Sequence, residues 1–265
     1  MMKWFELGLV ILTFASGLVW LLDRLFFAKA RKARAGLLDE DREPVVVDYA
    51  RAFFPILAVV LVLRSFVAEP FRIPSSSMMP TLLIGDFILV NKFAYGLRLP
   101  VNNKKVVGIG LPERGDVVVF RPPQYPDQDW IKRVVGLPGD RIAYRDNVLY
   151  VNGEASAYQP IGAYVGKGRG EDMTGASLLA EDLGGDGRHE VLEIDSPLFA
   201  QHGVGEWTVP EGEYFVMGDN RDRSDDSRFW GTLPETQLRG KAFLVWMNFD
   251  SAAGGVDFDR IGTRL

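Results

Sequence analysis

Two long apolar runs near the N-terminus constrain this chain most, because each approaches the length that crosses a bilayer. The first run, Leu7–Leu22, contains no charged residue, and with Trp4 and Phe5 it reaches about the ~20 residues that a spanning helix needs. A cleavable targeting peptide is the alternative, since Lys3 supplies a basic start. No small-x-small cleavage site follows the run, so we predict a retained transmembrane helix over residues 1–22.

The second run covers residues 52–68 and is interrupted by Arg64, whose long side chain can reach the headgroup region. A buried or interfacial helix is the alternative interpretation. The intervening loop, residues 23–51, carries the basic residues Arg24, Lys29, Arg31, Lys32, Arg34, Arg42 and Arg51. Such a loop stays cytoplasmic under the positive-inside rule. We therefore predict two spans, with the N-terminus and everything after residue 68 on the other side of the membrane.

The composition excludes several kinds of catalytic and binding site. The chain has 265 residues and no cysteine, which excludes disulfides, thiol nucleophiles and cysteine-ligated metals. Its net charge of −5 gives no general reason to expect nucleic acid as a partner. Its two histidines, His189 and His202, are distant in sequence from the serine-rich turn at Ser75–Ser77. A Ser-His-Asp triad would need one of them to fold back onto that turn, which we do not expect.

The exported part has the pattern of a β domain. From Glu69 onward, short apolar segments are separated by Gly, Pro, Asn and Asp, which is typical of strands joined by turns. Asp146-Asn147, between the apolar segments Arg141–Tyr144 and Val148–Val151, indicates a tight hairpin. Long amphipathic helices are scarce, which predicts a mainly β, antiparallel and partly barrel-like architecture.

Residues 154–209 differ from their surroundings, since they contain glycine-rich runs and few strong strand patterns. The run Gly166–Gly170 lacks the GxGxxG spacing, so a dinucleotide site is not expected. We therefore predict a β domain made of residues 69–153 and 210–265, with residues 154–209 as a loop-rich inserted subdomain.

A serine-rich turn and an isolated lysine are the strongest chemical signals. Pro74 and Pro80 bracket the turn and restrict its backbone, although such a turn by itself is also typical of a solvated loop. Lys132 lies in the apolar segment Trp130–Val135, where an inward-facing lysine would lose hydration and have a lowered pKa. A neutral amine of this kind can take a proton from a serine hydroxyl. The alternative is that Arg133 faces inward and Lys132 outward, because strand side chains alternate.

A third segment, the polar loop Gly218–Gly231, is rich in Asp, Ser and Arg. A calcium loop of the EF-hand type would need glycine at its sixth position, but counting from Asp219 gives Ser224 and from Asp222 gives Ser227. A calcium site is therefore disfavoured. The loop could instead orient the lysine and satisfy the polar groups buried around it.

Taken together, these segments resemble bacterial type I signal peptidase, also called leader peptidase, in its Gram-negative two-anchor form. The resemblance rests on four blocks in order: Pro74-Ser-Ser-Ser-Met-Met-Pro-Thr81, Gly85–Gly96, Lys132-Arg-Val-Val-Gly-Leu-Pro-Gly-Asp140 and Gly218–Gly231. It extends from the second apolar run to about Asp250. It implies a membrane-anchored endopeptidase that removes signal peptides through an acyl-enzyme, with no metal or organic cofactor.

The resemblance also implies roles for individual residues. Ser77 matches the nucleophile and Lys132 the general base. The Ser75 hydroxyl and the Ser77 backbone N–H match the donors that stabilise the oxyanion, a contribution of typically ~3 kcal/mol for one donor. Ser224 matches the residue that orients the lysine amine, while Asp226 and Arg228 match a supporting ion pair. The family often has glycine where this chain has Ser76, so Ser76 is the alternative nucleophile.

Specificity for Ala-x-Ala before the scissile bond would come from small apolar pockets. By motif position, the lining residues are expected to be Phe71, Ile73, Met78, Leu82, Trp130 and Ile131. Ordinary core packing is the alternative for each. The implied partners are signal-peptide-bearing preproteins and membrane phospholipid, and the implied location is the bacterial inner membrane, with the catalytic domain on the periplasmic side.

Two other classes of protein share some of these features. Penicillin-binding and β-lactamase enzymes place serine and lysine in Ser-x-x-Lys, but Met78, Met79 and Pro80 follow the three serines at that distance. An anchored β domain that binds exported polypeptides without cutting them would fit the same architecture. The intact Lys132 favours the enzyme.

Overall fold

The computed structural model describes residues 2–34, 43–63, 68–98, 104–185, 187–199 and 201–265. The chain divides into two compact units, one containing the N-terminal helices and the other formed by Glu69–Leu97 with Lys105–Leu265. The helices of the first unit are α1 (Met2–Leu22), the π-helical turn η1 (Asp23–Phe27), α2 (Ala28–Arg34) and α3 (Val45–Val62).

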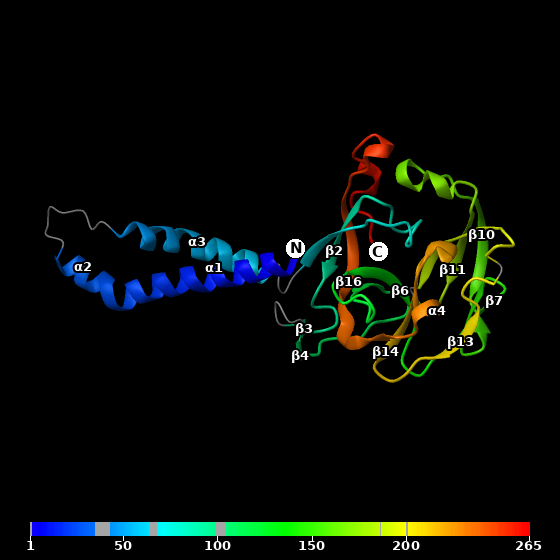
Figure 1. Ribbon diagram of the computed structural model, residues 1–265, viewed down its shortest axis with the longest axis horizontal. Helices are drawn as coiled ribbons and strands as arrows, with labels where there is room; N and C mark the ends of the chain where they lie inside the picture. The colour runs from blue at the N-terminus through cyan, green and yellow to red at the C-terminus, as the bar shows by residue number, and fades with distance from the viewer. Residues whose placement is uncertain (1, 35–42, 64–67, 99–103, 186, 200) are drawn as a thin grey trace. The chain divides into compact units, whose positions relative to one another are not determined.

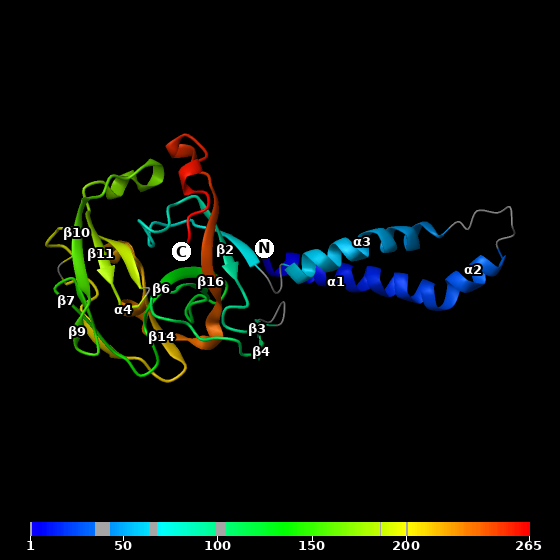
Figure 2. The same cartoon turned by 180° about the vertical axis from the view of Figure 1, so that it is seen from behind.

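Helices α1 and α3 lie side by side (Figures 1 and 2). Gly17 allows the close approach, because a Cβ at that position would lie 2.6 Å from the Phe54 ring. Trp20 packs beside Phe54 with ring centroids 5.6 Å apart. Large apolar side chains such as Phe14 and Ile56 remain exposed on both helices. Two helical segments, Leu7–Arg31 and Val45–Val62, are long and apolar enough to cross a membrane.

The predicted limits of the second span differ from the observed helix. Helix α3 begins at Val45, before the expected start at Ala52, because Val45–Val47 extend the apolar face and Pro44 precedes the first turn. Ala68, the expected end of the span, is instead the first residue of strand β1.

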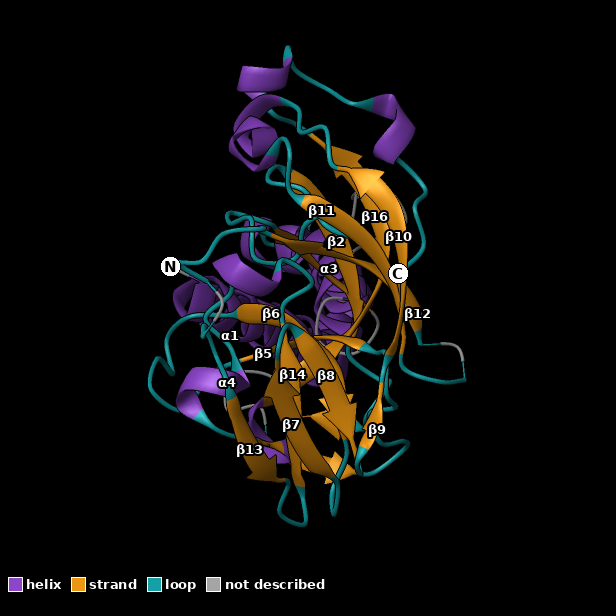
Figure 3. Cartoon of the chain, turned by 90° about the vertical axis from the view of Figure 1, so that its right-hand side faces the viewer, coloured by secondary structure: helices purple, strands orange, loops and turns teal. Residues whose placement is uncertain are grey.

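The second unit is built mainly of antiparallel strands (Figure 3). Its largest sheet has seven strands in the order β1-β2-β16-β5-β6-β14-β15. Their bounds are β1 Ala68–Arg72, β2 Asp86–Asn91, β16 Leu238–Asn248, β5 Val117–Phe120, β6 Trp130–Gly136, β14 Glu213–Met217 and β15 Leu233–Pro234. A mainly β architecture is therefore confirmed.

Both faces of this sheet are covered. Val117 and Val119 belong to one apolar cluster, and the intervening Val118 belongs to a second. Strand β6, which pairs with β5 and β14, is consequently buried along nearly its whole length. Side chains of either parity on β6 therefore lie in the interior.

A four-stranded sheet, β13-β7-β8-β9, contains the predicted hairpin. Its strands are β13 Gly205–Thr208, β7 Arg141–Arg145, β8 Val148–Val151 and β9 Glu154–Ala155. Asp146 and Asn147 have φ of 51° and 59°, as a type I′ turn requires, so this hairpin is confirmed.

The segment 154–209 is more ordered than the predicted loop-rich insertion. It contains a three-stranded antiparallel sheet of β10 (Ala157–Ala163), β11 (Ser177–Asp182) and β12 (Arg188–Glu193). Charged residues on these strands obscured the alternation of apolar side chains. Short elements complete the unit: β3 Leu97–Arg98, β4 Lys105–Val107, α4 Ser227–Trp230, and the 3₁₀ turns Gly168–Met173, Arg221–Arg223, Glu235–Gln237, Ser251–Ala253 and Phe258–Arg260.

Candidate active site

The serine-rich turn lies between β1 and β2 and is held by backbone contacts at both sides. The Ile73 N–H donates to Asp86 O at 2.8 Å, which ties the start of the turn to the start of β2. At the other side, Asn220 of the polar loop donates its backbone N–H to Ser77 O and its side-chain amide to Ser76 O, each at 3.1 Å. These bonds fix the position of Ser77 relative to the end of β14.

The Lys132 amine donates a hydrogen bond to the Ser77 hydroxyl at 2.7 Å and a second one to Ile131 O at 3.0 Å. Lys132 is only 4% exposed and Ser77 8% exposed. Burial lowers the pKa of Lys132 to about 8, although the nearby carboxylates of Asp226, Asp225 and Asp219 act in the opposite direction. The structure thus brings together a shielded hydroxyl and an amine that is partly neutral near pH 8.

Ser75 lies at the entrance to this pair. Its hydroxyl is 3.4 Å from the Ser77 hydroxyl, and its side chain is exposed. A donor at this distance from the attacking oxygen can reach the oxygen of a carbonyl that Ser77 attacks. The Ser76 hydroxyl, in contrast, has no hydrogen bond to the Lys132 amine among the described contacts.

Ser224 does not form the hydrogen bond to Lys132 that the resemblance implies. It is 3% exposed, and its hydroxyl has no partner of good geometry in the described part of the chain. It nevertheless packs next to Ser77, because a Cβ at Gly218 would collide both with Ser224 and with Ser77 O. Gly218 is therefore, together with Asn220, a point at which the polar loop contacts the serine turn.

Replacing Gly218 with alanine should lower kcat/KM for a preprotein by roughly 100-fold, because displacing a reacting group by ~1 Å costs about that much. The added methyl group must push away Ser77 O or Ser224. Gly108→Ala is the matched control, since a Cβ there meets only the Lys105 side chain at ordinary contact distance. Equal activity of the two variants would show that the contact at Gly218 does not position Ser77.

The Asp226 and Arg228 side chains form a fully buried ion pair, with Arg228 Nε 2.8 Å and Nη2 2.9 Å from the two carboxylate oxygens. Asp226 also accepts the Gly218 N–H at 3.0 Å. Burial by itself would raise the pKa of Asp226, but the Arg228 guanidinium outweighs burial and holds this pKa below its ordinary value. The pair thereby anchors the backbone at Gly218.

Arg133 is buried as well, so the expectation that only one residue of the Lys132-Arg133 pair faces inward is wrong. Its guanidinium donates to both oxygens of Asp219, at 2.8 and 2.7 Å, and to Gly115 O at 2.8 Å. Both faces of β6 are covered, and Asp219 compensates the charge on the second face. The sequence signal that could have identified this partner is the aspartate directly after Gly218.

A buried ionic network connects the inserted strands to the polar loop. Arg221 pairs with Glu181 of β11, and His189 Nε2 lies 3.0 Å from Glu181 Oε2 and 3.7 Å from Asp219 Oδ1. His189 therefore approaches the polar loop, although it is distant in sequence. Among the described contacts it meets carboxylates rather than Ser77, so it does not complete a triad.

The six residues predicted to line the substrate pockets belong to the apolar core around Ser77 and Lys132 or pack against it. Ile73, Met78, Leu82 and Ile131 belong to one buried cluster, and Phe71 packs against it. Trp130 packs against a neighbouring cluster, with the Lys132 amine 5.8 Å from its ring centroid. Met78 and Leu82 are fully buried, so core packing accounts for both in this conformation.

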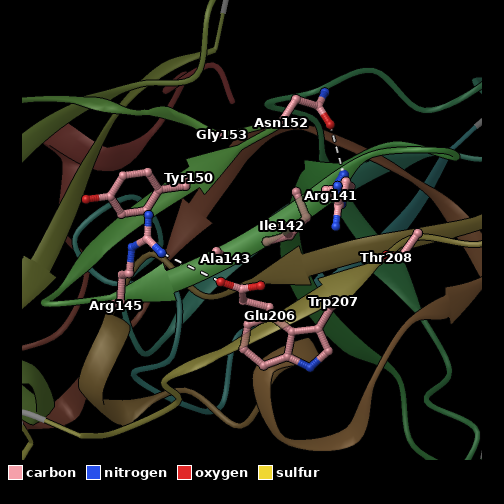
Figure 4. A pocket seen from close by; sticks show the side chains of 10 residues that line it. All are labelled: Arg141, Ile142, Ala143, Arg145, Tyr150, Asn152, Gly153, Glu206, Trp207 and Thr208. Carbon is pink, nitrogen blue, oxygen red and sulfur yellow. Dashed lines mark hydrogen bonds and ion pairs between the residues drawn. The ribbon is translucent and has the colours of Figure 1, made fainter.

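A separate hollow lies over the four-stranded sheet, around Ala143 (Figure 4). Arg145 stacks over the Tyr150 ring at 4.4 Å and lies 3.6 Å from Glu206. None of the predicted site residues lines this hollow, and it has no hydroxyl paired with a buried base. Among the described residues, no group of three or more His, Asp or Glu could hold a metal ion.

Comparison with known proteins shows the family of this chain. Residues 46–247 match the family described as "Signal peptidase, peptidase S26". Signal peptidase I of Pseudomonas fluorescens is 46% identical, over 92% of this chain and 92% of the relative. The Pseudomonas aeruginosa relative of the same name is 44% identical, over 97% and 98%, and that of Haemophilus influenzae 34%, over 98% and 92%.

The chain therefore belongs to the signal peptidase family, peptidase S26, and is a hydrolase. This assignment rules out the penicillin-binding class of Ser-Lys enzyme. The crystal structure of a signal peptidase I from Enterococcus faecalis is 32% identical and covers 51% of this chain and 98% of its own, with a TM-score of 0.31. That TM-score is too low to bear on the fold.

Proposed function

We propose that this protein is a membrane-anchored serine endopeptidase that removes signal peptides from exported preproteins, with Ser77 as nucleophile and Lys132 as general base. The observation that carries the proposal is the 2.7 Å hydrogen bond from the buried Lys132 amine to the Ser77 hydroxyl. The family assignment supports the reaction class, and the two apolar helices support the membrane anchor.

In the proposed reaction, the neutral Lys132 amine takes the Ser77 proton as the Ser77 oxygen attacks the scissile carbonyl. The Ser77 N–H and the Ser75 hydroxyl stabilise the oxyanion. When the C–N bond breaks, the Lys132 ammonium returns the proton to the leaving amine, and an ester on Ser77 remains. Lys132 then removes a proton from the water that attacks this ester and returns it to the Ser77 oxygen as the ester bond breaks, which restores the free enzyme.

The surroundings of Ser77 and Lys132 support roles for further residues in positioning these two and in binding the substrate. The Ser224 side chain lies next to Gly218 and Ser77 O, and it matches the residue that orients the lysine amine in the family. Asp226 and Arg228 would hold the Gly218 backbone in place. Phe71, Ile73, Met78, Leu82, Trp130 and Ile131 would bound the apolar pockets for the Ala-x-Ala residues.

The proposed location is the bacterial inner membrane, with the catalytic domain, residues 69–153 and 210–265, on the periplasmic side and the 154–209 insertion attached to it. The basic segment 23–51 supports this orientation, because such segments remain cytoplasmic. Phospholipid would surround the exposed apolar side chains of α1 and α3.

The direct test is cleavage of a purified Ala-x-Ala preprotein by the full chain in detergent, with the product termini read by mass spectrometry. A single cut after the second alanine supports the proposal. The control preprotein carries phenylalanine in place of that alanine and should remain intact. Binding of the preprotein without any cut would instead support the non-catalytic binding domain.

The pH dependence tests the base. Because the neutral amine is the active form, kcat/KM should rise with pH and reach half of its maximum near pH 8, the pKa to which burial lowers Lys132. Below that pH the rate should fall about tenfold per unit as the amine becomes protonated. The measurement is kcat/KM from pH 6 to 11 on a peptide without titrating groups near the bond. A rise centred near the ordinary lysine value of 10.5 would contradict a buried base.

A further inference from the structure

A hollow of about 450 Å³ lies against the polar loop and has not been used in the proposed reaction. It is lined by His202, Asp222, Arg223, Ser224, Asp225 and Phe229. None of the six residues predicted for the Ala-x-Ala pockets lines it. It is therefore available to a different part of the substrate.

The hollow adjoins the reacting groups. Ser224, which lines it, lies with Ser77 O against Gly218, and its buried hydroxyl has no hydrogen bond of good geometry within the described residues, although it is near enough to Asp226 to help lower the pKa of that carboxyl. Asp225 lies close enough to Lys132 for its carboxylate to act on the pKa of the amine. A polypeptide whose scissile carbonyl sits at Ser77 would consequently pass beside this hollow.

The walls of the hollow are apolar and its charge is negative. His202 and Phe229 lie with ring centroids 4.8 Å apart, and Phe229 is 46% exposed. The Arg223 charge is paired with Asp172, and Asp222 accepts the Ile194 N–H at 2.7 Å. Asp225 is exposed and has no ion pair with any described residue. A side chain with a long apolar stem and a cationic end matches these surroundings.

We propose that this hollow receives side chains of the first residues after the scissile bond, and that Asp225 makes it favour lysine or arginine over glutamate there. The inference rests on the proposed function. The stem of the basic side chain packs on the Phe229 ring while its charged end meets the Asp225 carboxylate. The Ser224 hydroxyl, at the inner end of the hollow, provides a hydrogen bond to the passing backbone.

The test uses the full chain in detergent and two preproteins that differ only in carrying lysine or glutamate at the second residue after the bond. Wild type should cleave the lysine substrate with a kcat/KM about two- to fivefold higher, the effect that an exposed charge pair contributes. The preference should shrink in 0.5 M salt, since salt screens exposed charges. Asp225→Asn should bring the ratio close to one. Glu154→Gln, which removes an exposed carboxylate on β9, should leave the ratio unchanged.

A second readout separates selectivity from a structural effect. Asp225 raises the pKa of Lys132, so Asp225→Asn should also move the rise in kcat/KM to lower pH. Asp226, Asp219 and Arg228 act on the same amine and are unchanged in this variant. A wild-type ratio near one, or the same ratio in wild type and Asp225→Asn, would overturn the inference while the proposed function stands. Failure to cut either preprotein would overturn both.

Discussion

Ser77→Ala should lower kcat/KM for an Ala-x-Ala preprotein by roughly 10⁴-fold or more, the loss typical of removing a covalent nucleophile. Lys132→Met should cause a similar loss, because without the amine nothing removes the Ser77 proton. The two losses should not add, since the 2.7 Å hydrogen bond makes the two residues one unit. Single-turnover cleavage followed over hours makes it possible to measure rates that are this much lower than that of wild type.

Ser76→Ala is the matched control, because it removes a neighbouring hydroxyl that does not contact the Lys132 amine. It should retain activity within a few-fold of wild type. Both alanine variants should unfold at the temperature of wild type, which shows that a loss of activity is not a loss of fold. Cleavage by Ser77→Ala together with inactivity of Ser76→Ala would show that Ser76, and not Ser77, is the nucleophile.

The second large effect concerns stability. Arg133→Met should reduce the free energy of unfolding of the β domain by about 3–5 kcal/mol, because it leaves the Asp219 carboxylate buried without its counter-charge. Burial by itself would raise the pKa of Asp219, but the Arg133 guanidinium is the largest opposing influence and the pKa lies below its ordinary value. In the variant that carboxylate must either take up a proton or admit water. Urea unfolding in detergent, followed by tryptophan fluorescence, measures the loss.

Arg145→Met provides the comparison, since Arg145 forms an exposed pair with Glu206 at 3.6 Å and should contribute less than about 1 kcal/mol. The double variant Arg133→Met/Asp219→Asn should recover part of the stability, because it removes the uncompensated charge. If Arg133→Met and Arg145→Met unfold at the same urea concentration, the buried pair does not stabilise the sheet.

Several features could be read from the sequence because they depend on neighbours in the chain. The apolar runs predict helices that can cross a membrane, and the Asp146-Asn147 turn predicts its hairpin, since only a tight turn with positive φ joins strands so closely. The serine-rich turn and Lys132 stood out through local chemistry, as a restricted turn and a lysine among apolar residues, while the choice of Ser77 within the turn rested on the family resemblance. In each case the information lies within one continuous segment of the chain.

Other features depended on surfaces that approach from distant parts of the chain. Strand alternation suggested that either Lys132 or Arg133 was exposed, but the seven-stranded sheet is covered on both faces and both are buried. The strands of the 154–209 segment were not predicted, because charged residues interrupt their apolar pattern. Glu181, for example, is buried in the core, where Arg221 compensates its charge. Periodicity reports which residues share a face, not whether another layer covers that face or supplies a counter-charge.

The sequence by itself therefore predicted the two apolar helices and the β class, and its resemblance to a known family led to the proposal of Ser77 and Lys132 as nucleophile and base. The tertiary structure alone decided the 2.7 Å contact between them, the packing of Gly218 against Ser77 and the hollow formed by His202 and Asp225. The physical reason is that a lowered lysine pKa and a paired buried arginine are properties of desolvation and distance. Both are set only when segments separated by more than fifty residues meet in the folded chain.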